Sequence, residues 1–198
     1  MSKKESTFIS MVLSILFITL ISGFALGFVN DLTIEPIAKA KLAKKINALK
    51  LVLPEFDNNP VAELKMVKPE FTKDSIEVYP AYKDGKFIGA AVVGSSEKGF
   101  SGLIKIMVGF TTDGTIKNIA VLYQKETPGL GTKMKDESFL KQFRNKNPSN
   151  FNLKVKKDGG EVDALTGATI STRAFSESAK MAYDVFMENL ETINTSKQ

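Results

Sequence analysis

Residues 103–123 decide the fold, and they read LIKIMVGFTTDGTIKNIAVLY. Aliphatic and β-branched side chains fill residues 103–110 and again residues 116–123, where they alternate so that each run has an apolar face. Between the two runs, residues 111–114 contain an Asp-Gly pair, which is a strong signal for a tight turn between antiparallel strands. The stretch therefore predicts a β-hairpin.

A second hairpin is predicted upstream. Residues 76–82 and 87–93 are rich in strand-forming side chains, and they flank another Asp-Gly pair within residues 83–86. Residues 54–75 are rich in Pro, Asn and charge, which predicts an irregular segment, and residues 152–156 are typical of a further strand. Two hairpins in succession predict an antiparallel sheet.

Two helices are predicted after the hairpins. A short helix follows Asp136 and would bury Phe139, Leu140 and Phe143. A longer helix over residues 171–193 carries apolar residues at spacings of three and four. Because strands come first and helices follow without regular alternation, we predict an α+β domain with an antiparallel sheet flanked by helices.

The N-terminal region predicts a membrane anchor. Residues 8–29 form a run of 22 residues without a charge, which as a helix is about 33 Å long and matches a hydrocarbon core of about 30 Å. The alternative is a cleavable signal peptide, but the run exceeds the usual apolar length of about 7–15 residues. Lys3 and Lys4 precede the run, so the positive-inside rule places residues 1–7 in the cytoplasm and the rest of the chain outside.

The remaining chain divides into a stalk and a domain. Residues 36–53 predict a basic amphipathic helix with Pro36 at its first position. We expect residues 30–75 to form this stalk helix and a connecting segment, and residues 76–198 to form the folded domain. The expected location is the inner membrane of a bacterium, crossed once, with the domain on the periplasmic side and the anchor in the lipid bilayer.

The composition excludes several kinds of redox centre. The chain contains no Cys and no His, which removes thiolate zinc sites, iron–sulfur clusters, c-type haem attachment and His-based catalysis. The net charge of +5 is spread along the chain without a long basic block, so a nucleic-acid partner is not expected. If the protein does redox chemistry, an organic cofactor must carry it.

The sequence Asp163-Ala164-Leu165-Thr166-Gly167-Ala168-Thr169 directly precedes the last predicted helix. Its small residues leave room for a bulky group near the backbone, and a helix N-terminus favours a phosphate. Arg173, one turn into the helix, would add a cation if its side chain turned that way. The alternative is that Thr169 or Ser171 only caps the helix.

This segment resembles the flavinylation motif of the FMN-binding domain family, Asp-x-x-(Ser/Thr)-Gly-Ala-Thr. Asp163, Thr166, Gly167, Ala168 and Thr169 match it position by position. The resemblance implies that a flavin transferase using FAD esterifies the Thr169 hydroxyl with FMN phosphate. Asp163 would then hold the metal and FAD phosphates during attachment, or would order the loop.

Two further segments carry the same resemblance. The loop Glu126-Thr127-Pro128-Gly129-Leu130-Gly131 is similar to a loop in the G subunit of the Rnf electron-transport complex and in the related C subunit of the sodium-pumping NADH:quinone reductase. On its own, this loop reads equally well as an ordinary turn, with Glu126 either at the flavin or in solvent. The segment Gly99-Phe100-Ser101-Gly102 resembles the glycine–aromatic turn of the family, which adds Ser101 and Gly102 to the expected FMN contacts.

Two positions depart from the resemblance. Gln124 and Thr132 stand where many relatives are expected to have His and Asp. If that His handles protons elsewhere in the family, this chain does not share that role.

The resemblance implies a flavoprotein subunit of an ion-translocating electron-transport complex, with covalent FMN as its cofactor. It would relay electrons between other membrane subunits of an Rnf-type complex rather than act as an enzyme alone, so no catalytic or metal-binding residue is expected. Two alternatives remain: a stand-alone anchored flavin reductase, and a cofactor-free anchored binding or scaffold module.

Overall fold

The computed structural model describes residues 7–69, 72 and 74–194. Lys3 and Lys4, which oriented the predicted anchor, lie outside this part of the chain. The chain divides into two units, residues 1–43 and 44–198, and each is considered by itself.

The N-terminal region is a single helix, α1 (Phe8–Val52), and Pro36 lies inside it. The prediction that Pro36 begins a separate stalk helix was therefore wrong. Local contacts support the helix on both sides of the proline: the Thr33 hydroxyl donates to the Val29 carbonyl at 2.8 Å, and Lys39 pairs with Glu35 at 2.7 Å. The helix is long and apolar enough to cross a membrane, with a mean hydropathy of 2.5 over its most apolar stretch.

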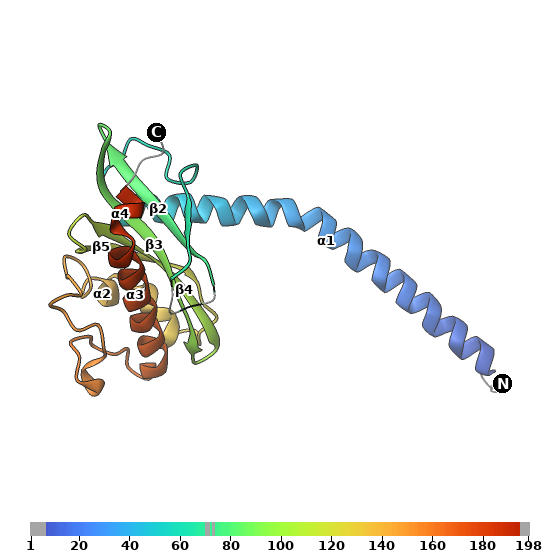
Figure 1. The fold of residues 1–198 in the computed structure, drawn as a ribbon. Helices are drawn as coiled ribbons and strands as arrows, with labels where there is room; N and C mark the ends of the chain where they lie inside the picture. Colours follow the sequence, from blue (N-terminus) through green and yellow to red (C-terminus); the bar gives the residue numbers. More distant parts are fainter. Residues whose placement is uncertain (1–6, 70–71, 73, 195–198) are drawn as a thin grey trace. The chain divides into compact units, whose positions relative to one another are not determined.

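The second unit contains a five-stranded antiparallel sheet in the order β1-β2-β3-β4-β5 (Figure 1). The strands are β1 (Lys65–Val67), β2 (Ile76–Lys83), β3 (Lys86–Gly99), β4 (Gly102–Thr111) and β5 (Ile116–Tyr123). Both predicted hairpins are confirmed. The segment predicted to be irregular, residues 54–75, contains β1, a strand too short to show an alternating pattern in the sequence.

Helices cover both faces of the sheet. On one face lie α3 (Thr169–Glu188) and α4 (Leu190–Asn194) (Figure 1). Helix α3 approaches so closely that a side chain at Gly94 of β3 would meet the backbone of Ser178. This packing holds the middle of α3 against the sheet.

The last turns of α1 cover the other face. Leu49 and Val52 are buried there against small and apolar side chains of the sheet, including Ala91 and Met107. Residues 44–53 therefore belong to the compact unit, which begins well before the boundary expected at residue 76.

The C-terminal half differs from the sequence predictions in two places. Helix α2 (Glu137–Leu140) forms as expected, and Phe139, Leu140 and Phe143 are buried. Residues 152–156 are not a strand: apart from one isolated bridge at Val155, the segment makes local contacts, and the Asn152 N–H donates to the Glu161 carboxylate. Helix α3 begins two residues earlier than predicted and ends at Glu188, so the predicted last helix is two helices.

Candidate functional site

Three loops that are far apart in the sequence meet beside the start of α3. They are the turn between β3 and β4 at residues 99–102, the loop after β5 at residues 126–131, and residues 163–171. The carboxylate of Glu126, in the second of these segments, bonds to the other two: it accepts from the Ser101 N–H at 3.0 Å and from the Ser171 hydroxyl at 2.5 Å. The three motifs found in the sequence thus form one site.

The loop at residues 126–131 is built on a tight turn. The Leu130 N–H donates to the Thr127 carbonyl at 3.2 Å, with Pro128 and Gly129 between them. Gly129 has a φ of +76°, the left-handed value that a type II turn needs at its third position, and Pro suits the second position. The local sequence therefore dictates this turn.

The two positions that depart from the family resemblance hold this loop in place. The side-chain oxygen of Gln124 accepts from the Glu126 N–H at 2.5 Å, and the Thr132 hydroxyl accepts from the Gly129 N–H at 3.0 Å. Gln124 and Thr132 therefore act as hydrogen-bond partners of the loop backbone.

A second glycine turn precedes α3. The Ala168 N–H donates to the Leu165 carbonyl at 2.9 Å, and Gly167 has a φ of +74°. The Thr172 hydroxyl bridges the turn to the helix by accepting from the Leu165 N–H at 3.1 Å and donating to the Ala168 carbonyl at 2.9 Å. The two turns also touch, because a side chain at Gly167 would lie 3.2 Å from Leu130.

Thr169 is the first residue of α3 and is half-buried. The N-cap position is Ala168, which makes no side-chain capping bond. The alternative in which Thr169 or Ser171 caps the helix is therefore wrong: Ser171 donates to Glu126, and the Thr169 hydroxyl has no hydrogen-bond partner among the described residues. The amides of the first helical turn, which have no intrahelical partner, are left for an anion.

Glu126 is 4% exposed, so the interpretation that it is solvated was wrong. Its neighbour Lys125 is exposed. The space around the carboxylate is small, since a side chain at Gly99 would lie 2.7 Å from one of its oxygens and a side chain at Gly131 would lie 2.9 Å from the other.

Two charged residues considered for the site are held by other partners. The guanidinium of Arg173 forms a two-bond pair with Asp158, at 2.7 and 2.8 Å, and these hydrogen bonds lower the pKa of the Asp158 carboxyl. Arg173 is therefore not directed at the start of α3. Asp163 is exposed and pairs with Lys156 at 2.7 Å, and Thr166 is exposed beside it.

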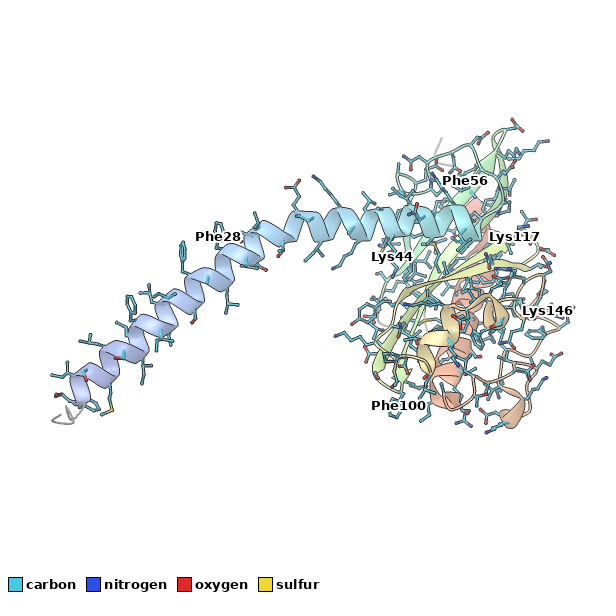
Figure 2. All side chains as sticks on the ribbon, turned by 180° about the vertical axis from the view of Figure 1, so that it is seen from behind. Phe28, Lys44, Phe56, Phe100, Lys117 and Lys146 are labelled. Atoms are coloured by element: carbon cyan, nitrogen blue, oxygen red, sulfur yellow. The ribbon has the colours of Figure 1, made fainter. Side chains whose placement is uncertain are left out.

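Three apolar side chains of these segments stay exposed. Phe100, in the turn whose next residue binds Glu126, is 69% exposed and lies at one end of the domain (Figure 2). Leu130 is 42% exposed, and Ile170 is 48% exposed. Ile170 was not predicted from the sequence. Its only indication there is an apolar side chain outside the buried face of α3.

The described residues contain no cluster of three or more acidic, His or Cys side chains suited to a metal. What they offer is a nucleophilic hydroxyl, a set of unpaired helix amides and an apolar rim. Such a site fits a phosphate that carries a flat apolar group.

Comparison with known proteins gives one consistent result. The FMN-binding domain family matches residues 99–184. The G subunit of the ion-translocating oxidoreductase complex of Vibrio atlanticus is 33% identical over 171 residues, which are 82% of this chain and 82% of that protein. The G subunit from Cereibacter sphaeroides is 33% identical over 178 residues, which are 86% of this chain and 80% of that protein.

Among solved structures, the crystal structure of Shewanella oneidensis NqrC has a TM-score of 0.50 to this chain at 23% identity. The match covers 67% of this chain and 70% of that chain. It supports the fold, an α+β domain built on an antiparallel sheet.

Proposed function

Because this chain belongs to the family formed by the G subunits of ion-translocating oxidoreductase complexes, we propose that it is the membrane-anchored flavoprotein subunit of such a complex. It relays electrons through FMN joined by a phosphoester to Thr169. The observation that carries the proposal is the start of α3, where a hydroxyl without a partner among the described residues lies beside uncapped helix amides.

The residues of the site divide between the two ends of the cofactor. The backbone amides of Thr169 and Ile170 and the positive end of the α3 dipole hold the phosphate. Gly167 would leave room for the cofactor beside the turn, and the exposed apolar side chains of Phe100 and Leu130 would be available to its ring. When bound, FMN supplies one- and two-electron redox chemistry, and the protein tunes it through nearby dipoles and charge.

The attachment is a phosphoryl transfer catalysed by a separate flavin transferase. A bond forms between the Thr169 oxygen and the FMN phosphorus of FAD, and the pyrophosphate bond to AMP breaks. AMP leaves with the bridging oxygen, and the hydroxyl proton is released to solvent. Asp163 is exposed, so it is accessible to the transferase as a ligand for the metal and FAD phosphates. Its pair with Lys156 also supports the other role, ordering of the loop.

The membrane arrangement follows from the sequence. We propose that residues 8–29 cross the inner membrane once, that residues 1–7 are cytoplasmic, and that the FMN-binding domain within residues 76–198 faces the periplasm. Residues 30–43 connect the two, because the compact unit already begins at residue 44 and the last helical turns of α1 pack on its sheet. The partners are other membrane subunits of an Rnf-type complex.

The test is covalent flavin content. The full chain is co-expressed with a flavin transferase, purified, denatured and measured by intact mass and in-gel flavin fluorescence. We expect a gain of one FMN minus one water in the wild type and no gain in Thr169→Ala. A wild-type chain without added mass would overturn the proposal and favour the cofactor-free scaffold.

A second measurement separates the relay role from that of a stand-alone reductase. Co-purification with multi-spanning membrane subunits supports the relay role. Turnover of a soluble electron acceptor by the isolated flavinylated chain, without those subunits, would instead favour the reductase.

A further inference from the structure

We propose that Glu126 is the positioning residue of the flavin site, and that its carboxylate holds the attachment turn in the geometry that flavinylation requires. The inference rests on the proposed function at Thr169. It starts from the two hydrogen bonds that join Glu126 to Ser101 and to Ser171. Ser171 is two residues from Thr169, so this contact acts on the first turn of α3.

The burial of Glu126 is unusual for a carboxylate without a cation. It is 4% exposed, and among the described residues no ion pair involves it. Burying a charged group is unfavourable unless hydrogen bonds compensate. A chain that needed only to fill this space would be better served by an apolar side chain, so the carboxylate is kept for the bonds it accepts.

Those bonds also determine what Ser171 does. The Ser171 hydroxyl donates to one oxygen of the Glu126 side chain at 2.5 Å, which uses the single hydrogen that this hydroxyl has to donate. A serine at the third position of a helix otherwise competes for the free backbone groups of the first turn. By engaging Ser171, Glu126 removes that competitor and leaves the amides beside Thr169 for a phosphate.

Two glycines of the family motifs make room for this carboxylate. A side chain at Gly99 would lie 2.7 Å from one oxygen of Glu126, and a side chain at Gly131 would lie 2.7 Å from its Cβ and 2.8 Å from the Ser171 hydroxyl. Neither glycine has a left-handed φ, so both are needed for space rather than for backbone conformation. Gly99 and Gly131, from two of the three motifs, thus leave space for Glu126.

The test uses the full chain with four substitutions. Glu126→Ala removes both hydrogen bonds, and Ser171→Ala removes one of them. Glu126→Gln keeps both, because its amide oxygen can accept from Ser101 while its NH₂ donates to a reversed Ser171 hydroxyl. Glu77→Ala is the matched control: Glu77, on β2, accepts from Lys45 of α1 and from Tyr79 of β2, and it belongs to none of the three segments of the site.

The first measurement is the rate of covalent flavin incorporation by a flavin transferase, followed by intact mass. We expect about a tenfold or greater loss in Glu126→Ala, because small displacements of a reacting group have large effects on rate. Ser171→Ala should show a smaller loss. Glu126→Gln should recover most of the rate, and Glu77→Ala should retain it.

The second measurement needs no flavin. Amide hydrogen exchange over residues 165–172 of the flavin-free chain should rise in Glu126→Ala and not in Glu77→Ala. A folded Glu126→Ala with wild-type incorporation and exchange would overturn the proposal, as would an equal loss of incorporation in Glu77→Ala. A wild-type chain that never acquires flavin overturns the function at Thr169, while the exchange data still decide whether Glu126 holds the turn.

Discussion

Two pairs of glycine turns build this domain, and they are held in different ways. The hairpin turns join β2 to β3 and β4 to β5, whereas the site turns contain Gly129 and Gly167. In the second hairpin, Asp113 accepts from the hydroxyls of Thr111 and Thr115, both two residues away. In the site, by contrast, Leu130 contacts Gly167, and Glu126 binds Ser171 across 45 positions of sequence.

The difference separates turns that should matter only for stability from turns that should also matter for flavin attachment. The geometry of a hairpin turn is set by its own Asp-Gly sequence, although distant residues also bond to both turns: the Asp84 N–H donates to Asp57, and the Asn147 side chain donates to the Asp113 carbonyl. The site turns have correct local geometry too, but their mutual placement depends on long-range contacts. Substitutions in a hairpin should therefore affect stability alone, and matched substitutions in the site should also affect flavin attachment.

The largest effect is expected from glycine substitution. Gly85 of the first hairpin and Gly167 have similar φ angles, +72° and +74°, so alanine at either should cost about 1–2 kcal/mol of unfolding free energy. Gly85 has open space around it, whereas alanine at Gly167 would crowd Leu130. Gly167→Ala should therefore be the more destabilising and should also reduce covalent flavin content, as measured by chemical denaturation and intact mass. If Gly85→Ala and Gly167→Ala reduced flavin content equally, the hairpin turns and the site turns would not differ in their effect on flavin attachment.

A smaller effect is expected from loss of a threonine hydroxyl. Thr172→Val leaves the Leu165 N–H without its acceptor and should cost about 1 kcal/mol of unfolding free energy, together with slower flavin attachment. Thr115→Val removes a hydroxyl bond to Asp113 in the hairpin and should lower stability by about 0.5 kcal/mol. Its flavin content should be that of the wild type; a loss there would show that the hairpin and the site are coupled.

The smallest expected effect is a dependence of folding stability on pH. Hydrogen bonds from Thr111 and Thr115 lower the pKa of Asp113 to about 2, below the value of about 3.9 in an unfolded chain. The charged carboxylate therefore stabilises the folded hairpin above pH about 4, and this contribution is lost as the pH falls toward 2. Asp113 is at the surface, so the contribution is modest.

Thermal unfolding of the wild type and of Asp113→Asn measures this contribution. The difference in Tm between the two should be present at pH 6 and should shrink as the pH approaches 2, while covalent flavin remains equal in both. A difference in Tm that does not change with pH would mean that the Asp113 charge plays no part.

Much of the architecture was predictable because its signals are local. Alternating apolar residues and Asp-Gly pairs specified both hairpins, and apolar spacing specified the buried face of α3. Local signals failed in three places, and the last of these is decided by a long-range side-chain contact. Pro36 is accommodated within a continuous helix. Residues 152–156 bond to the backbone of residues 161 and 162 and to the Glu161 side chain without forming a strand. Ser171 bonds to Glu126 rather than capping.

The sequence by itself determined the strands of both hairpins, the apolar N-terminal helix, the two glycine turns and the motif that ends at Thr169, because each depends on neighbouring residues. Only the tertiary structure decided that the three motifs form one site, since no local pattern records which loops meet. It also decided that Glu126 is buried and that the start of α3 is left uncapped. The physical reason is that a buried carboxylate must find its donors wherever the fold provides them, and here it finds them in two distant loops.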